Sequence, residues 1–252
     1  MYSLTLSLIL WSQLVFNYNQ SVGVKKELLH FKSSDGVEMS ADFYFVRKST
    51  SPLIILFHQA GWSRGEYLEI APKLNALGYS CLAVDLRSGG AVNDVQNETN
   101  INALKASKNT RYVDAYQDMQ AAVKYGSSRL TKGKLIVWGS SYSSSLALKL
   151  AGEMSDKVDA VIAFSPGEYF SSQGVGRDYI TSGASRVTQP VFVTSARSEK
   201  NNWWGMYVSI PSEEKQYYLP ETAGNHGAKA LWSEYADSDE YWMALSGFLK
   251  SI

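Results

Sequence analysis

A serine in a tight, glycine-containing turn is the residue of this sequence best suited to nucleophilic chemistry. Residues 134–138 are mostly apolar and read as a buried strand, residues 139–143 form a Gly-x-Ser-x-small turn, and a helical pattern follows. Such a strand–turn–helix places its serine in a strained backbone conformation with the hydroxyl exposed. The pattern predicts Ser141 as a nucleophile, and the backbone N–H of Tyr142 as a donor to an oxyanion on a reacting carbonyl.

A serine hydroxyl is a weak nucleophile at neutral pH, so Ser141 requires a neighbouring base, and histidine is the natural one. The sequence contains three histidines. His30 lies in a short alternating run and is read as structural, whereas His58 and His226 each follow a predicted strand. Ser143 stands where the usual motif has a second glycine, so the turn alone is also consistent with a serine-rich connection without catalytic function.

The elements that must position these residues alternate between strands and helices. Alternating runs at 25–31 and 37–46, joined by an Asp-Gly turn, predict a β-hairpin. The apolar run 53–57 is typical of a strand buried on both faces. Further strands are expected at 79–85, 134–138, 158–164, 191–194 and 216–219, and helices at 66–77, 111–125, 142–154, 202–208 and 228–249.

This alternation predicts an α/β fold: a mostly parallel central sheet of about eight strands, helices on both faces, and an antiparallel N-terminal hairpin at one edge. The length and the absence of repeats or linkers favour a single domain over residues 25–252. The polar stretches 88–110 and 167–189 are expected to be long loops. Neither is large enough for a cap domain.

The chain resembles the α/β-hydrolase superfamily, in particular its dienelactone-hydrolase-like and small esterase branches, over residues 25–252. Besides the serine turn, residues 57–62 are similar to the family's His-Gly-type oxyanion loop, with Gln59 where glycine is common, and residues 85–89 look like its Asp-x-Arg-Gly turn. The resemblance implies that His58 shapes the oxyanion loop and that the backbone N–H of Gln59 or Ala60 is the second oxyanion donor.

The resemblance also implies a base and an acid for Ser141. His226 lies in a glycine-flanked loop after the last predicted strand, where the family has its base, and Glu199 follows the strand 191–194, where the family has its acid. The acid would orient the imidazole and stabilise the imidazolium. The chain order of nucleophile, acid and base is that of this fold. Glu168 and Asp178, after the preceding strand, stay open as alternative acids.

Aromatic side chains gather in the loops expected at the carboxyl ends of the strands. Such side chains could line an apolar pocket for the acyl or leaving group, although aromatic residues serve cores equally well. Besides Tyr142, the candidates are Trp62, Tyr169, Phe170, Trp203 and Trp204.

Composition excludes several classes of function. Lys plus Arg equals Asp plus Glu at 24 each, and basic runs are short, so nucleic acid is not an expected partner. Cys81 is the only cysteine and lies in a predicted buried strand, which excludes an intrachain disulfide and argues against thiol chemistry. No motif indicates a metal, redox or nucleotide cofactor.

The first 23 residues read as a candidate secretory signal. No charged side chain precedes Lys25, residues 4–16 are largely apolar but short for a membrane span, and residues 21–23 form a small-x-small cleavage pattern. This favours export to the periplasm or the medium. The positive segment that usually opens a signal is missing, so a buried N-terminal element in a cytoplasmic protein is the alternative.

Together these features predict a serine hydrolase that cleaves a small or medium carboxylic ester through an acyl-enzyme. Amide, lactone and short peptide bonds remain open, because one triad serves all these acyl transfers. A non-catalytic scaffold with the same fold is the alternative from another class. The oligomeric state is not indicated by the sequence.

Overall fold

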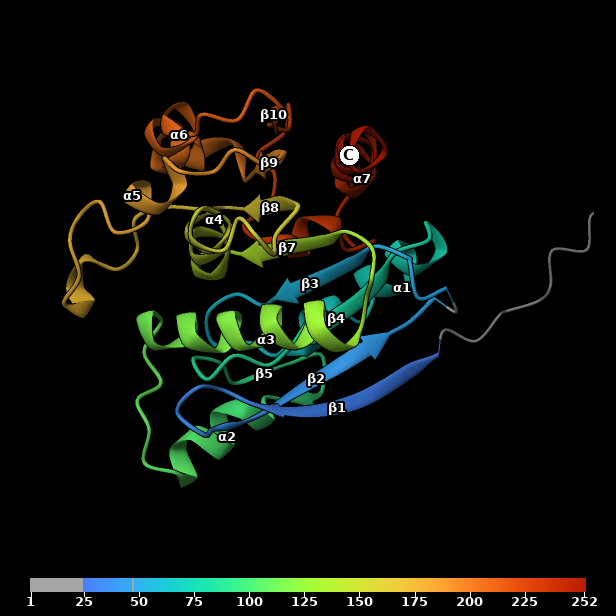
Figure 1. The fold of residues 1–252 in the computed structure, drawn as a ribbon. Helices are drawn as coiled ribbons and strands as arrows, with labels where there is room; N and C mark the ends of the chain where they lie inside the picture. Colours follow the sequence, from blue (N-terminus) through green and yellow to red (C-terminus); the bar gives the residue numbers. More distant parts are fainter. Residues whose placement is uncertain (1–24, 47) are drawn as a thin grey trace, which may run out of the picture.

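An eight-stranded sheet runs through the computed structural model, which describes residues 25–46 and 48–252 (Figure 1). The strand order is β1-β2-β4-β3-β7-β8-β9-β10. These strands are β1 (Lys26–Lys32), β2 (Glu38–Tyr44), β3 (Leu53–Phe57), β4 (Ser80–Val84), β7 (Leu135–Ser140), β8 (Ala160–Phe164), β9 (Val191–Thr194) and β10 (Lys215–Tyr218). A separate two-stranded ribbon consists of β5 (Ala91–Val92) and β6 (Val95–Gln96).

The predicted hairpin forms one edge of this sheet. Strands β1 and β2 are antiparallel, with Lys26 opposite Tyr44, and the turn between them contains Gly36 at φ 88°, a conformation that glycine adopts without strain. Strand β2 also pairs antiparallel with β4, whereas all other neighbours in the sheet are parallel. The predicted strand count, the mostly parallel pairing and the antiparallel edge are confirmed.

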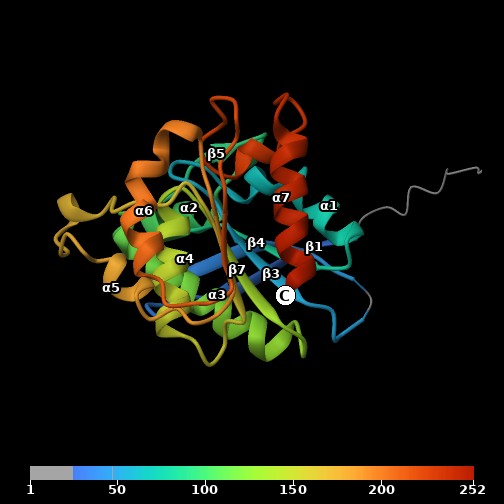
Figure 2. The same ribbon diagram turned by 90° about the horizontal axis from the view of Figure 1, so that it is seen from above.

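Helices cover both faces of the sheet because its central strands are apolar on both sides (Figure 2). In β3, Leu53 and Ile55 pack against α3 and α4, while Ile54 and Leu56 pack against α1 and α7. The helices are α1 (Ile70–Ala76), α2 (Glu98–Lys105), α3 (Tyr116–Arg129), α4 (Tyr142–Glu153), α5 (Thr181–Ala184), α6 (Lys200–Ser209) and α7 (Ser238–Ser251). Short 3-10 turns are η1 (Arg64–Tyr67), η2 (Val113–Ala115), η3 (Ser171–Gln173), η4 (Arg197–Glu199) and η5 (Ala228–Leu231).

Two predicted helices are interrupted. The helix expected at 66–77 is split into η1 and α1, and the one expected at 228–249 into η5 and α7. In the second case the chain leaves helical geometry at Trp232, with φ −73° and ψ 140°. The Trp232 ring stacks on Trp62 with centroids 5.4 Å apart, and its indole N–H donates to the Glu66 carbonyl. These tertiary contacts override the periodic pattern.

The stretches predicted as long loops contain regular structure. Residues 88–110 hold β5, β6 and α2, and residues 167–189 hold η3 and α5. The polar composition of the first stretch has a structural use: the Asn97 side chain caps α2 by accepting from the Asn100 N–H, and donates to the Leu86 carbonyl. The polar residues that were read as a loop signal therefore serve as caps and turns.

Buried ion pairs hold the chain where it leaves β4. The guanidinium of Arg64 bonds Asp85, and that of Arg87 bonds Asp118 at 2.7 Å; all four residues are buried. Burial raises the pKa of Asp85 to about 6, although the neighbouring Arg64 opposes this effect. Asp85 thus anchors the turn after β4 through Arg64, next to the loop that carries residues 58–60.

The candidate secretory signal lies outside the described residues, so export stays a prediction. Among residues 25–46 and 48–252, no helix is long and apolar enough to cross a bilayer.

Candidate active site

The chain brings Ser141, Glu199 and His226 together at the carboxyl end of the sheet. Ser141 directly follows β7, Glu199 ends the short turn after β9, and His226 follows β10. Because these strands are parallel, the segments that follow them emerge at the same edge. Three residues separated by up to 85 positions in sequence therefore meet in space.

The turn at Ser141 has the strained geometry that its motif predicts. Ser141 has φ 58° and ψ −125°, and its N–H donates to the Phe164 carbonyl at 2.8 Å. A side chain at Gly139 would lie 2.3 Å from the Ser143 carbonyl oxygen, so only glycine fits beneath the first turn of α4. The Ser143 hydroxyl donates to the Phe57 carbonyl and accepts from the Ser140 N–H. Serine at this position ties the turn to β3.

The side chains of the three residues form a continuous hydrogen-bonded relay. The His226 Nε2 atom lies 2.8 Å from Ser141 Oγ, and Nδ1 lies 2.5 Å from Glu199 Oε1. A carboxylate only accepts, so Nδ1 carries the proton that it donates to Glu199. Nε2 is then left as an acceptor for the Ser141 hydroxyl. This arrangement lets the imidazole take up the serine proton.

Glu199 is held by more than the histidine. Its second oxygen, Oε2, accepts from the Ser165 hydroxyl at 2.7 Å and from the Ala196 N–H at 3.2 Å. Burial works against ionisation of this carboxyl, but the hydrogen bonds from His226 and Ser165 outweigh it and hold the pKa of Glu199 below its ordinary value. Glu199 is therefore an anion at neutral pH.

The alternative acids lie elsewhere. The Glu168 carboxylate accepts from the N–H of Ile180 and from the N–H and hydroxyl of Thr181, at the start of α5. Asp178 is exposed. Neither carboxylate contacts His226 among the hydrogen bonds of the described residues.

The two other histidines are also placed away from Ser141. His30 is exposed on the edge strand β1, with Nδ1 3.1 Å from the Ser40 hydroxyl. His58 is fully buried, donates from Nδ1 to the Gln59 carbonyl, and accepts at Nε2 from the Leu86 N–H. Burial lowers the pKa of His58 to about 4, so it is neutral and holds the shape of its loop.

The two predicted positions for the second oxyanion donor differ in the structure. The Gln59 N–H already donates to Glu66 Oε2 at 2.7 Å, so it is not available to an oxyanion. The N–H groups of Ala60 and Tyr142 are not among the hydrogen-bond donors found within residues 25–46 and 48–252. Of the two predicted loop donors, Ala60 is the one that remains.

A model of the family described as serine aminopeptidase, S33, matches residues 48–203, more than half of the chain. The chain is a member of this hydrolase family. A comparison with curated protein sequences found no match.

Solved structures are similar to the hydrolase over most of its length. Dienelactone hydrolase from Anabaena variabilis has a TM-score of 0.69 and 14% identity, with 90% of this chain and 97% of that one covered. An esterase from Pyrococcus furiosus has a TM-score of 0.68 and 16% identity, with 90% of this chain and 93% of that one covered. Acetyl xylan esterase from Paenibacillus sp. R4 has a TM-score of 0.66 and 15% identity, with 90% of this chain and 88% of that one covered. At these identities the likeness is one of fold, and it confirms the predicted dienelactone-hydrolase-like α/β-hydrolase fold.

The predicted aromatic pocket of the hydrolase requires correction. Phe170 and Trp203 are buried in the main hydrophobic cluster, Trp203 from α6 with its indole N–H donating to the Ser195 hydroxyl, so they act in packing. Trp204 is 36% exposed and stacks on Tyr207. Trp62 and Tyr169 are half-buried, and the Tyr169 hydroxyl donates to the Ser165 carbonyl beside Glu199. Of the five candidates, Tyr169 is therefore the one that bonds a partner of Glu199, namely Ser165.

Three residues of the site were not found by sequence reasoning. Ser165, directly after β8, donates to Glu199 and accepts from the Gly227 N–H, so it joins the acid to the histidine loop. Ser140 and Glu66 bond each other behind the nucleophile. The sequence signal available for Ser140 and Ser165 was a serine at the end of a buried strand, a pattern that also occurs without function. Glu66 lies in a polar stretch, and no sequence pattern indicated its burial.

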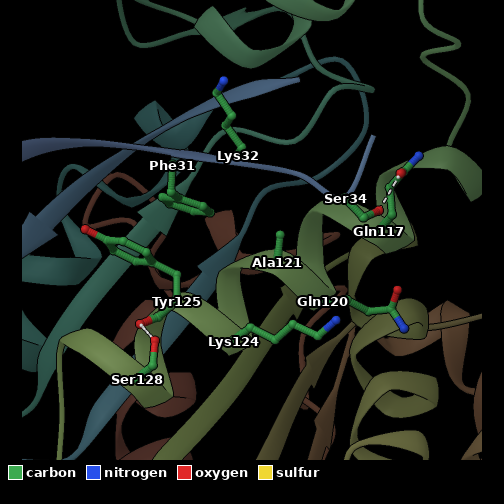
Figure 3. A pocket seen from close by; sticks show the side chains of 9 residues that line it. All are labelled: Phe31, Lys32, Ser34, Gln117, Gln120, Ala121, Lys124, Tyr125 and Ser128. Carbon is green, nitrogen blue, oxygen red and sulfur yellow. Dashed lines mark hydrogen bonds between the residues drawn. The ribbon is translucent and has the colours of Figure 1, made fainter. Parts of the chain in front are cut away.

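A pocket of about 330 Å³ between β1 and α3 lies apart from the relay (Figure 3). Phe31 and Tyr125 stack there with centroids 4.6 Å apart, and the Ser34 hydroxyl donates to Gln117. None of its lining residues belongs to the relay. Within the described part of the chain, no group of three His, Cys, Asp or Glu side chains is arranged to hold a metal ion.

Proposed function

We propose that this hydrolase cleaves carboxylic esters of small molecules, with Ser141 as nucleophile, His226 as base and Glu199 as the acid that orients it. The observation that supports this is the relay itself, with 2.8 Å from Ser141 Oγ to His226 Nε2 and 2.5 Å from His226 Nδ1 to Glu199 Oε1. Family membership supports hydrolysis as the reaction class.

The first half of the proposed reaction acylates the serine. Ser141 Oγ attacks the carbonyl carbon while its proton moves to His226 Nε2, and the carbonyl oxygen becomes an oxyanion that accepts from the N–H groups of Tyr142 and Ala60. The negative charge of Glu199 stabilises the imidazolium. The tetrahedral intermediate then expels the alkoxide, which leaves as the alcohol after taking the proton from His226.

The second half releases the acid. A water molecule gives one proton to His226 Nε2 and attacks the acyl carbon, so that a second oxyanion forms in the same place. When this intermediate collapses, the bond to Ser141 Oγ breaks and the serine recovers its proton from His226. The carboxylic acid leaves, and no cofactor is consumed in the cycle.

The test is labelling with a fluorophosphonate together with turnover of p-nitrophenyl esters of increasing acyl length. We expect a covalent adduct on Ser141, located by peptide mass spectrometry, and ester hydrolysis that the probe abolishes in proportion to labelling. A folded sample that forms no adduct and hydrolyses none of the esters would favour the scaffold function instead.

Amide bonds are the second candidate substrate, because the matching family is described as serine aminopeptidase. An amide is harder to cleave than an ester, since its amine must be protonated before it leaves. Amino-acid p-nitroanilides measured beside the matched p-nitrophenyl esters decide between them. We expect the esters to have the higher kcat/KM. A higher kcat/KM for the anilides would indicate that the enzyme cleaves peptides instead of esters.

Exchange of Glu199 for glutamine is expected to lower kcat by about 10²- to 10⁴-fold, because an amide cannot supply the charge that stabilises the imidazolium or hold the reactive tautomer. Glu168→Gln is the matched control: its carboxylate bonds Ile180 and Thr181 instead of His226, so kcat should stay within about twofold. Steady-state kinetics on one ester measures both variants. A large loss of kcat in Glu168→Gln, with little change in Glu199→Gln, would show that Glu168 is the acid that orients His226.

A further inference from the structure

A fully buried carboxyl group lies behind the proposed catalytic residues and takes no part in the relay. Glu66 is 0% exposed and belongs to η1, the turn that follows the oxyanion loop. Burying a carboxylate is costly unless its oxygens are hydrogen-bonded. The partners of Glu66 therefore indicate what the buried charge is used for.

Both oxygens of Glu66 accept hydrogen bonds from segments that carry catalytic groups. Oε2 accepts from the Gln59 N–H at 2.7 Å, and Oε1 accepts from the Ser140 hydroxyl at 2.6 Å. The Ser140 oxygen in turn accepts from the Ala228 N–H at 2.8 Å. Gln59 precedes the oxyanion donor Ala60, Ser140 precedes the nucleophile, and Ala228 lies two residues after His226.

The three segments are packed closely around this carboxylate. A Cβ atom placed on Gly227 would lie 2.6 Å from the Ser140 hydroxyl oxygen and 2.9 Å from Gln59 Oε1. The residue next to His226 thus contacts the other two segments with no space for a side chain. A shift of one segment must therefore move the others, because packed interiors do not deform freely.

The hydrogen-bond partners of Glu66 suit its charged form. Both bonds are donated to the carboxylate, one by a backbone N–H and one by a hydroxyl whose own oxygen already accepts from Ala228. A protonated carboxyl group would direct an O–H towards the Ser140 oxygen, which can accept it together with the Ala228 N–H, so the Ser140 proton would lose its acceptor and the hydroxyl would have to reorient.

We propose that Glu66 is a positioning residue of the ester hydrolase: its ionised carboxylate holds the oxyanion loop, the nucleophile strand and the histidine loop in the arrangement in which Ala60, Ser141 and His226 reach one carbonyl group. This inference rests on the function proposed above. The buried charge serves catalysis and not stability, because an apolar side chain of similar size would fill the space without the free-energy cost of burying a charge.

Glu66 changes its charge within the pH range of ordinary activity assays. Burial raises its pKa to about 7, against the hydrogen bonds from Ser140 and Gln59. The titratable side chains that act on it are His226, Tyr67 on its own turn and Tyr142 at the start of α4. As the pH falls through 7, Glu66 takes up a proton and the positioning is lost.

The test compares Glu66→Gln with the wild-type protein in steady-state ester hydrolysis. Glutamine keeps the volume but replaces one acceptor by an NH₂ donor, which faces either the Gln59 N–H or the Ser140 hydroxyl. We expect kcat to fall by about 10- to 100-fold and KM to change by less than about twofold, because the displaced groups act mainly on the transition state. Glu213→Gln, an exposed glutamate, is the matched control and should behave as wild type.

The pH profile separates positioning from a loss of folded protein. In the wild type, Glu66 must be ionised for the three segments to stay in position, so its protonation should steepen the fall of log kcat/KM with decreasing pH. In Glu66→Gln this contribution is absent, and the acid side of the profile should be shallower. Far-UV circular dichroism at each pH confirms that the samples stay folded.

Ser140→Ala covers the case in which Glu66→Gln does not fold. It removes the hydroxyl that links Glu66 to Ala228 and leaves the bond to Gln59, so kcat should drop by about 3- to 10-fold. Unchanged kcat in Ser140→Ala, or a folded Glu66→Gln with wild-type kcat and the same acid slope, would overturn the inference. If the wild type itself neither forms the Ser141 adduct nor hydrolyses esters, the proposed function fails instead, and the two failures are distinct.

Discussion

Replacement of Ser141 by alanine is expected to lower kcat for ester hydrolysis by about 10⁴- to 10⁶-fold. The hydroxyl is the atom that bonds the acyl carbon in the proposed reaction, and no neighbouring group can replace it in that step. What remains is the effect of binding and of the proposed oxyanion donors, Tyr142 and Ala60. Steady-state kinetics and the loss of the fluorophosphonate adduct measure the result.

Two variants control this experiment. Ser128→Ala, an exposed serine on α3, should keep both turnover and labelling. Ser141→Gly should be as inactive as Ser141→Ala but more stable, because the backbone at φ 58° and ψ −125° is strained for any residue with a Cβ. Relief of about 1–3 kcal/mol of strain exceeds the extra unfolded-state entropy of glycine, about 0.5–1 kcal/mol. Residual turnover near the wild-type level in either inactive variant would remove Ser141 from the mechanism.

Replacement of His226 by alanine is expected to lower kcat by about 10⁴- to 10⁶-fold as well, because without a base the Ser141 hydroxyl keeps its proton and scarcely attacks. Labelling of Ser141 by the fluorophosphonate should slow by a similar factor, since the probe reacts with the same activated oxygen. His30→Ala is the matched control: His30 is exposed on β1, with Ser40 as its partner, and its loss should leave the kinetics unchanged.

The double variant Ser141→Ala/His226→Ala tests whether the two residues act in the same step. Residues that act as one unit are strongly non-additive, so the double variant should be no slower than the worse of the two single variants, within about threefold. A multiplicative loss would mean that Ser141 and His226 act in separate steps, which is incompatible with the 2.8 Å contact carrying the proton.

Local sequence predicted those parts of the molecule that depend on neighbouring residues. The hairpin of β1 and β2 follows from alternation and an Asp-Gly turn, and the strained turn at Ser141 follows from the small residues on either side of it. Strands apolar on both faces, such as β3, predicted a sheet covered by helices on both sides. In each case the signal lies in one continuous stretch of the chain.

Predictions failed where distant contacts override a local pattern. The break between η5 and α7 occurs at Trp232, whose ring stacks on Trp62. The local sign of a new helix, Asp237 followed three residues later by Glu240, was outweighed in the prediction by the periodic pattern. The Gln59 N–H was an equal candidate with Ala60 until the structure placed Glu66 against it. Phe170 and Trp203, expected near substrate, are core residues because both side chains pack into the main hydrophobic cluster.

By itself the sequence determined the α/β architecture, the serine turn and the small set of histidines and acids from which a relay must be built, because periodicity and turn chemistry act over short distances. Only the tertiary structure decided between equivalent candidates: it set Glu199 against His226 and Glu168 against α5, and it joined Glu66 to three loops. The physical reason is that parallel strands bring their following segments to one edge, where hydrogen-bond partners are chosen by three-dimensional distance and not by separation along the chain.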